Sequence, residues 1–289
     1  MNFEGADTSF VPAAEDYTLA DRWILSRCAV TARDVTANLE KYELGEAGRT
    51  IYEFLWSEFC DWYIELTKAR LYDKENVRAK NTALYVLRTV LERTLRLLHP
   101  FMPFLTEEIW QRVPHEGRSI MVALWPEADE SLVDEAAERE MASIMEVIVR
   151  IRNMRAEVEA TPGKRSEVIL HFADKALAPV FAAHAAYFAA LSWADPLTVL
   201  EDGAAKPENA MTAIVAGVEI YLPLKGLIDV EKEKARLTKE LANLVGEEKR
   251  LGGKLANEGF VKKAPPAVVE KEREKLEAAK EKKKAVEER

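Results

Sequence analysis

Hydrophobic positions in the first hundred residues follow the spacing of amphipathic helices. Apolar or small residues recur every three or four positions from Ile24 to Val35, and a leucine stripe with the same spacing runs from Leu84 to Leu98. A segment with this period buries one face and exposes the other. We predict four helices, over about residues 19–44, 51–69, 77–98 and 103–111.

Local signals predict where these helices begin and end. Thr18 and Asp21 have the spacing of a capping box, in which a hydroxyl and a carboxylate satisfy the free amides of a first turn. Gly45 is expected to end the first helix, and Pro100 the third, because proline cannot extend a helix. Short connections between long helices are typical of antiparallel neighbours, so we predict a helical bundle over residues 19–128, after a lead over 1–18.

The pattern changes after residue 112. Trp125 and Pro126 are predicted to dock an irregular stretch against the bundle, and a long helix is expected over about 132–160. Beyond it, β-prone runs alternate with an alanine-rich segment that favours a helix. The predicted strands lie in residues 167–172, 197–200 and 212–222, and the predicted helix in residues 175–191. This mixed order predicts a small α/β domain over residues 129–224.

Leucines set four and three positions apart begin at Leu237, and the same seam continues from Val269 to Val286. Glycine and prolines interrupt it between the two halves. Two such segments predict an antiparallel coiled-coil hairpin over residues 225–289. The fold class is therefore expected to be mainly α: a helical bundle, a small α/β domain and a C-terminal hairpin.

Charge divides unevenly along the 289 residues. The whole chain carries 41 Lys and Arg against 50 Asp and Glu, a net charge of −9. Residues 225–289 hold 18 basic and 14 acidic residues (+4), which leaves 23 and 36 (−13) for the rest. This balance excludes a uniformly basic nucleic-acid binder but indicates a basic interaction arm. Without an apolar leader or a membrane-length apolar run, we expect a cytoplasmic protein.

Catalytic and metal-binding motifs are missing from the sequence. The four histidines lack metal-ligand spacing, glycine-rich phosphate loops are absent, and Cys28 and Cys60 lie on apolar helix faces where thiols are usually buried and inert. An aromatic-rich run over residues 52–63 allows two interpretations. It is either core at helical spacing or a surface on which nucleic-acid bases stack.

Several segments together resemble one family. Residues 20–27, 56–66 and 98–105 resemble the anticodon-binding domain of bacterial valyl-tRNA synthetase, and residues 226–230 and 257–269 resemble the coiled-coil arm of that family. The run E-F-C-D-W-Y is the most specific of these motifs. The middle segment matches in the order of its elements more than in motifs.

The resemblance implies recognition of the tRNA for valine by a monomer, with the bundle receiving the anticodon stem and loop and the arm meeting the outer corner. The positions at which it implies contacts from the arm are Arg250, Lys254, Lys262, Lys263, Arg273 and Lys275. Lys275 stands where the family pattern has arginine, which keeps the charge and loses planar stacking. In the bundle, the exposed cations that we select as candidate contacts are Arg22, Arg27, Lys68 and Arg70.

The resemblance also implies what this chain lacks. The family's ATP-binding signatures, its editing domain and an upstream anticodon-reading segment have no counterpart in these residues. We therefore expect no cofactor and no activity in this chain alone, with ATP and magnesium serving the catalytic domain of a parent valine–tRNA ligase. The charged seam leaves one alternative open, a coiled-coil module that binds another protein and no RNA.

Overall fold

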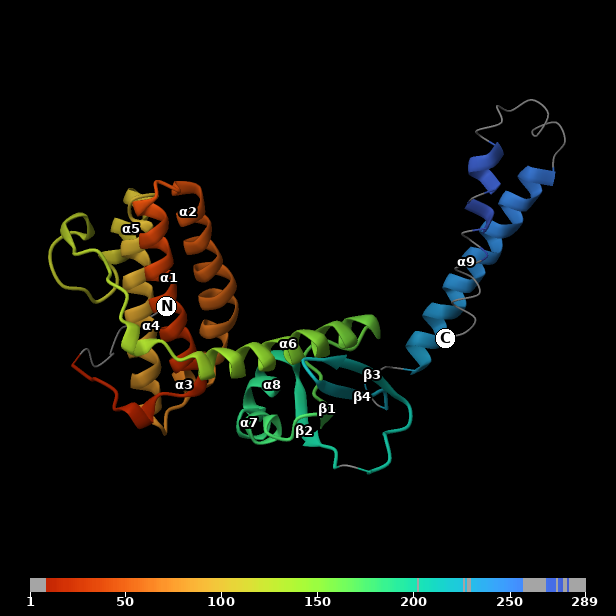
Figure 1. Ribbon diagram of the computed structural model, residues 1–289. Helices are drawn as coiled ribbons and strands as arrows, with labels where there is room; N and C mark the ends of the chain where they lie inside the picture. The colour runs from red at the N-terminus through yellow and green to blue at the C-terminus, as the bar shows by residue number, and fades with distance from the viewer. Residues whose placement is uncertain are drawn as a thin grey trace. The chain divides into compact units, whose positions relative to one another are not determined.

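The computed structural model describes residues 9–201, 203–225, 227, 230–256, 269–273, 275–277 and 280. It divides into two compact units, residues 1–157 with 162–223, called the trunk below, and residues 158–161 with 224–289, called the arm unit. As predicted, the described residues are mainly helical, with one small sheet (Figure 1). The predicted domain boundaries at residues 128 and 224 remain predictions.

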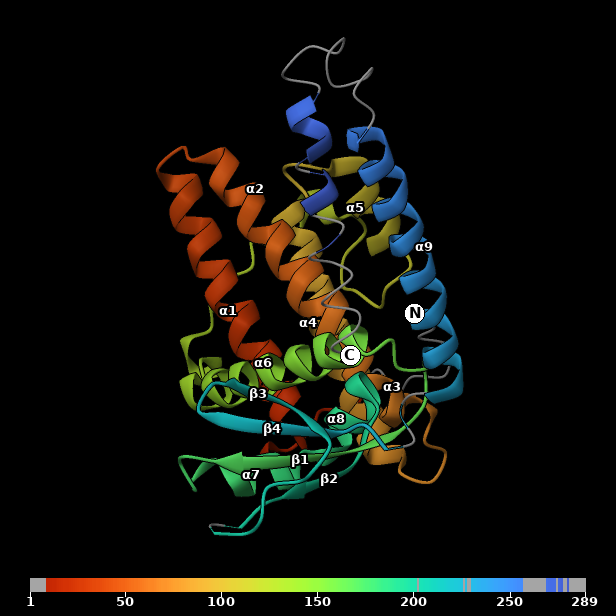
Figure 2. The same cartoon turned by 90° about the vertical axis from the view of Figure 1, so that its right-hand side faces the viewer.

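Helices α1, α2, α4 and α5 of the trunk lie side by side as a bundle, and α6 runs crosswise to them (Figures 1 and 2). The helices of the bundle and α6 are α1 (Leu19–Glu40), α2 (Leu44–Glu53), η2 (Phe54–Ile64), α3 (Glu65–Tyr72), α4 (Val77–Leu98), α5 (Pro103–Trp110) and α6 (Glu135–Glu157). Short 3-10 turns precede or connect them at η1 (Ala14–Asp16), η3 (Ile120–Val122) and η4 (Glu130–Leu132).

The predicted start of α1 is confirmed and its predicted end is wrong. Thr18 Oγ1 accepts from the backbone N–H of Asp21 at 3.3 Å, and the carboxylate of Asp21 accepts from the N–H of Thr18 at 2.9 Å. The helix stops at Glu40, and Tyr42 takes a left-handed conformation with φ of 61°. Gly45 lies inside α2, because the chain reverses at Tyr42 and not at the glycine.

The second predicted helix is one continuous helical run, α2–η2–α3, whose middle part is π-helical. A π turn adds a residue per turn and rotates the following side chains relative to those before it. Phe54, Phe59 and Tyr63 are buried at steps of five and four residues. Ala69, which an uninterrupted α period places on the buried face, is exposed.

The connection after α5 packs onto the bundle as predicted. Trp125 lies against a buried cluster that includes Val35, Ile51 and Leu97. Its indole N–H donates to Thr36 Oγ1 at 2.9 Å. This pairing satisfies the polar atom of a half-buried indole and fixes the loop against α1.

A four-stranded mixed sheet of order β2-β1-β4-β3 completes the trunk. Its strands are β1 (Ser166–Phe172), β2 (Ala194–Val199), β3 (Ala210–Val215) and β4 (Val218–Pro223). Helices α7 (Leu177–Ala183) and α8 (Ala185–Ser192) connect β1 to its parallel neighbour β2, and β4 pairs antiparallel with both β1 and β3. Phe172 of β1 packs edge-on to Phe181 of α7, and Phe181 also contacts Phe188 of α8. The two helices therefore cover one face of the sheet.

The arm unit contains α9 (Val230–Ala256) and helical turns within residues 269–280 that lie beside it (Figures 1 and 2). Leu251 and Val269 are both buried. Glu272 pairs with Lys254, whereas Lys280, further along the chain, is attracted to Glu248, which is earlier on α9. The two segments therefore run antiparallel, as the hairpin prediction requires. The turn predicted around residues 257–266 lies outside the described residues.

Candidate nucleic-acid interface

Two of the predicted arm contacts are exposed arginines on opposite segments of the hairpin. Arg250 on α9 has 68% of its side chain exposed, and Arg273 on the returning segment 62%. Their ion pairs are long, 3.9 Å to Glu247 and 3.6 Å to Glu270. Exposed pairs of this length contribute little to stability, so both guanidinium groups can exchange their partners for a phosphate at small cost.

Lys254 and Lys275 are brought together by a single carboxylate. Each Nζ lies 3.1 Å from an oxygen of Glu272, a side chain that is almost entirely buried between the two segments. Hydrogen bonds from Lys254 and Lys275 hold the pKa of Glu272 below its usual range, against the opposing effect of burial. These two lysines thus join the segments of the hairpin as well as carrying positive charge. Lys262 and Lys263, also predicted contacts, lie outside the described residues.

Arg70 differs most from the exposed cation that the sequence predicted. Its guanidinium donates two hydrogen bonds of 2.7 Å to the carboxylate of Asp21, which is fully buried. Burial opposes the charge of Arg70, yet the hydrogen bonds and attraction from Asp21 outweigh it and raise the pKa of Arg70. The hydroxyl of Tyr63 donates to the same carboxylate. Burial raises the pKa of the Tyr63 hydroxyl well above its usual range. Arg70 is therefore a largely buried structural cation.

Arg27 is also less exposed than predicted. Its Nε and Nη2 donate to Glu58 at 2.8 and 3.0 Å, and its Nη1 donates to Glu138 at 3.3 Å. The hydrogen bonds to Glu58 raise the pKa of Arg27 against the cost of burial. The guanidinium thereby joins α1 to η2 and α6.

The remaining two bundle candidates are exposed, as predicted. Arg22 pairs with Asp134 at 2.9 Å and Lys68 with Glu65 at 2.7 Å. Nearly half of each basic side chain remains accessible. Their contact with RNA stays a prediction.

The aromatic run over residues 52–63 is neither all core nor all surface. Tyr52 and Trp56 are exposed and stack on each other, with ring centroids 6.4 Å apart and ring planes 6° from parallel. Trp62 and Tyr63 are buried. Sequence periodicity missed this division because the π turn separates the two sets of side chains.

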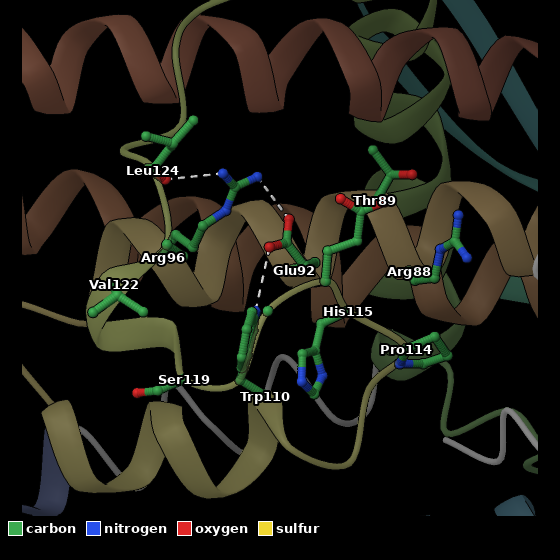
Figure 3. Close-up of a pocket in the computed structure, with 13 residues that line it drawn as sticks. Arg88, Thr89, Glu92, Arg96, Trp110, Pro114, His115, Ser119, Val122 and Leu124 are labelled. Carbon is green, nitrogen blue, oxygen red and sulfur yellow. Dashed lines mark hydrogen bonds and ion pairs between the residues drawn. The ribbon is translucent and has the colours of Figure 1, made fainter.

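A cavity of about 760 Å³ opens between α4, α5 and the loop that follows α5 (Figure 3). Trp110 and His115 stack in its wall with ring centroids 3.6 Å apart. Glu92 accepts from Trp110 Nε1 at 3.3 Å and from Arg96 Nη2 at 2.7 Å, and Arg96 Nη1 donates to the carbonyl of Leu124 at 2.9 Å. These groups bind one another, so the lining stabilises the loop against α4.

Desolvation by burial raises the pKa of both cysteine thiols. Burial raises the pKa of the Cys28 thiol to about 12, which keeps it protonated and unreactive. Among the described residues, no group of three or more His, Cys, Asp and Glu side chains is placed to hold a metal ion. In the same residues, no helix combines the length and apolar character that crossing a bilayer requires.

Two family models match separate parts of this chain. Residues 21–170 match the family described as the anticodon-binding domain of tRNA ligase, and residues 229–289 match the valyl tRNA synthetase tRNA binding arm. This chain belongs to the valyl-tRNA synthetase family. It contains the anticodon-binding domain and the tRNA-binding arm of that family.

Individual relatives extend the match across the chain. The valine–tRNA ligase of Carboxydothermus hydrogenoformans is 52% identical over 100% of this chain and 32% of its own length. The ligases of Clostridium acetobutylicum and Geobacillus stearothermophilus are 46% and 45% identical over 95% and 99% of this chain, and over 31% and 32% of their own lengths. The chain thus spans about a third of the length of these relatives.

Proposed function

We propose that this chain positions the tRNA for valine for a valine–tRNA ligase. In this proposal the arm neutralises phosphates at the outer corner of the tRNA, and the trunk meets the anticodon stem and loop. Joining valine to tRNA with ATP and magnesium belongs to parts of the relatives that this chain does not cover. The observation that carries the proposal is the pair of exposed, weakly paired arginines, Arg250 and Arg273, on a segment that matches a tRNA-binding arm.

The hairpin also supports a monomer over the alternative of a coiled-coil docking module. Leu251 and Val269 are buried within one chain, at 1% and 7% exposure, while Leu241, Leu244 and Leu255 are half-buried. Where the seam is covered from within the chain, it leaves less apolar surface for a partner helix. The surface that remains is charged and suits a polyanion.

The test is binding of tRNA by the full chain at several salt concentrations. In the double variant Arg250→Gln/Arg273→Gln we expect the affinity at low salt to fall about tenfold or more. The slope of log K against log salt should become shallower by about 1.4–1.8, since each of the two lost phosphate contacts removes roughly 0.7–0.9. Glutamine removes the charge and keeps a polar side chain. Lys275 is left unchanged so that the ion pairs of Glu272 with Lys254 and Lys275 remain.

The matched control is Arg112→Gln/Arg139→Gln, which removes the same charge from two exposed trunk positions. This control should change the affinity much less and leave the slope nearly unaltered. Equal losses in the two double variants would show only a general charge effect. A chain that ignores tRNA and forms dimers in light scattering would favour the protein-docking alternative.

A further inference from the structure

Tyr52 and Trp56 form an exposed aromatic surface on the helical run α2–η2, called the Tyr52–Trp56 platform below. The two residues are one helical turn apart and 62% and 57% exposed. Their near-parallel rings stack at 6.4 Å between centroids. Phe54 and Phe59 of the same run point into the core. The exposed rings of the platform are therefore not part of the buried core of the bundle.

Single exposed apolar residues are common, but two large rings held side by side are a different feature. Each ring restricts the other, so little conformational freedom remains to be lost when a third flat group stacks on them. The platform also lies where the helix becomes π-helical, at Phe54. Such π-helical turns are frequent at functional sites.

The charges around the platform decide what chemistry it accepts. Arg49, one turn before Tyr52, donates to Glu46 at 2.5 Å and to Glu53 at 2.8 Å. These three side chains sum to −1, and residues 1–224 together carry −13 (23 basic, 36 acidic). A phosphate backbone is repelled by this surface, whereas the uncharged face of a nucleobase is not.

An unpaired base fits these requirements better than a duplex. Bases in a helix are stacked and expose their edges, while bases in loops can be splayed out and stacked on aromatic side chains. The trunk residues that match the anticodon-binding family include both Tyr52 and Trp56. The ligand class of this unit is thus RNA with a single-stranded loop.

We propose that Tyr52 and Trp56 form a stacking platform for one unpaired base of the tRNA loop that the trunk receives. This inference rests on the proposed function, to which it adds an uncharged stacking contact with a base. The base lies against the outer face of the aromatic pair with its phosphate turned away from Glu46 and Glu53. The platform supplies attraction that the acidic trunk cannot supply through charge.

The experiment uses the full chain and compares Trp56→Ala, Tyr52→Ala and Trp56→Phe. We expect each alanine variant to weaken tRNA binding by about 5- to 100-fold, because loss of one stacked base has an effect of this size. The salt slope should stay unchanged, since no phosphate contact is removed. Trp56→Phe should keep most of the affinity, because a flat ring remains.

Tyr72→Ala is the matched control, since Tyr72 is an exposed aromatic at the end of the same helical run. A second comparison uses two RNA probes, a stem–loop with an unpaired loop and a blunt duplex of the same stem. The platform variants should weaken only the stem–loop. All variants should unfold at the temperature of the unchanged chain, because these side chains are exposed.

Three results would overturn the inference. Unchanged affinity in Trp56→Ala and Tyr52→Ala, with salt-dependent tRNA binding still present, would refute the platform and leave the proposed function standing. Equal losses in Tyr72→Ala, or equal losses on the duplex, would show that no particular base is held. A chain that fails to bind tRNA at any salt concentration would refute both proposals.

Discussion

Two candidate arginines of the trunk and two of the arm unit use their guanidinium groups in opposite ways. In the trunk, Arg70 and Arg27 are enclosed by carboxylates and hold helices together. In the arm unit, Arg250 and Arg273 stand out from the hairpin with long, weak pairs. An arginine in a sequence is therefore a candidate RNA contact only when its neighbours leave it accessible.

This contrast suggests a division of labour in the way the chain meets RNA. Charge attraction acts over several ångströms, depends on salt and carries no sequence information. Contacts to bases act at short range and carry that information. In the proposed function the arm unit supplies the first kind of contact, and the acidic trunk, with its exposed aromatic pair, supplies the second. Three substitutions test how far the contrast extends.

The largest effect is expected at Arg70. Arg70→Met should lower the free energy of unfolding of the trunk by about 3–5 kcal/mol, because the carboxylate of Asp21 would remain buried without its partner. Denaturant unfolding measures this loss. The double variant Asp21→Leu/Arg70→Met should recover part of the lost stability. The coupling energy of this double-mutant cycle measures the interaction between Asp21 and Arg70. A loss below about 1 kcal/mol would mean that the pair is solvated.

The sequence was sufficient for most of the helices and strands but not for this pair. The capping box at Thr18 and the strand over residues 166–172 follow from local chemistry and period, and both are observed. Arg70 and Asp21 are 49 residues apart, so their contact depends on how α3 packs against α1. Local pattern cannot reveal a partner that tertiary packing supplies.

The aromatic run shows a second limit. Reading residues 52–63 with an α period puts Tyr52, Trp56, Phe59 and Tyr63 on one face. The π-helical register of η2, which begins at Phe54, rotates Phe59 and Tyr63 relative to Tyr52 and Trp56, so that the first two are buried and the last two are exposed. The sequence permitted both interpretations of the run, and the structure assigns each to a different part of it. In the arm unit, the pattern indicated the basic positions, whereas Glu272 as the partner of two of them was not expected.

An intermediate effect is expected at Arg27. Arg27→Met should cost about 1–2 kcal/mol of stability, between the value for an exposed pair and that for a buried one, because Glu58 and Glu138 are half-buried. Arg33→Met is the control on the same helix, since Arg33 is exposed and its pairs with Asp34 and Glu130 are exposed as well. Thermal unfolding and tRNA binding are measured together. If tRNA affinity falls in Arg27→Met while stability does not, Arg27 contacts RNA and the contrast between trunk and arm fails.

The smallest effect is expected at Glu272 in the arm unit. Its pKa is lowered in the folded hairpin by Lys254 and Lys275, so its stabilising contribution is present above the ordinary pKa of 4.5 and disappears as the pH falls below that value. Glu272→Gln should therefore reduce the hydrogen-exchange protection of residues 241–256 at pH 7. The difference from the unchanged chain should shrink as the pH falls from 4.5 through the lowered pKa of the folded hairpin, and vanish once Glu272 is protonated there as well.

Glu270→Gln serves as the matched control for Glu272→Gln, because Glu270 is exposed and its pair with Arg273 is long. It should leave protection nearly unchanged at both pH values. A loss of protection in Glu272→Gln that persists at low pH would mean that the shape of the side chain, and not its charge, joins the two segments. The charges of Lys254 and Lys275 would then not be needed to join the two segments.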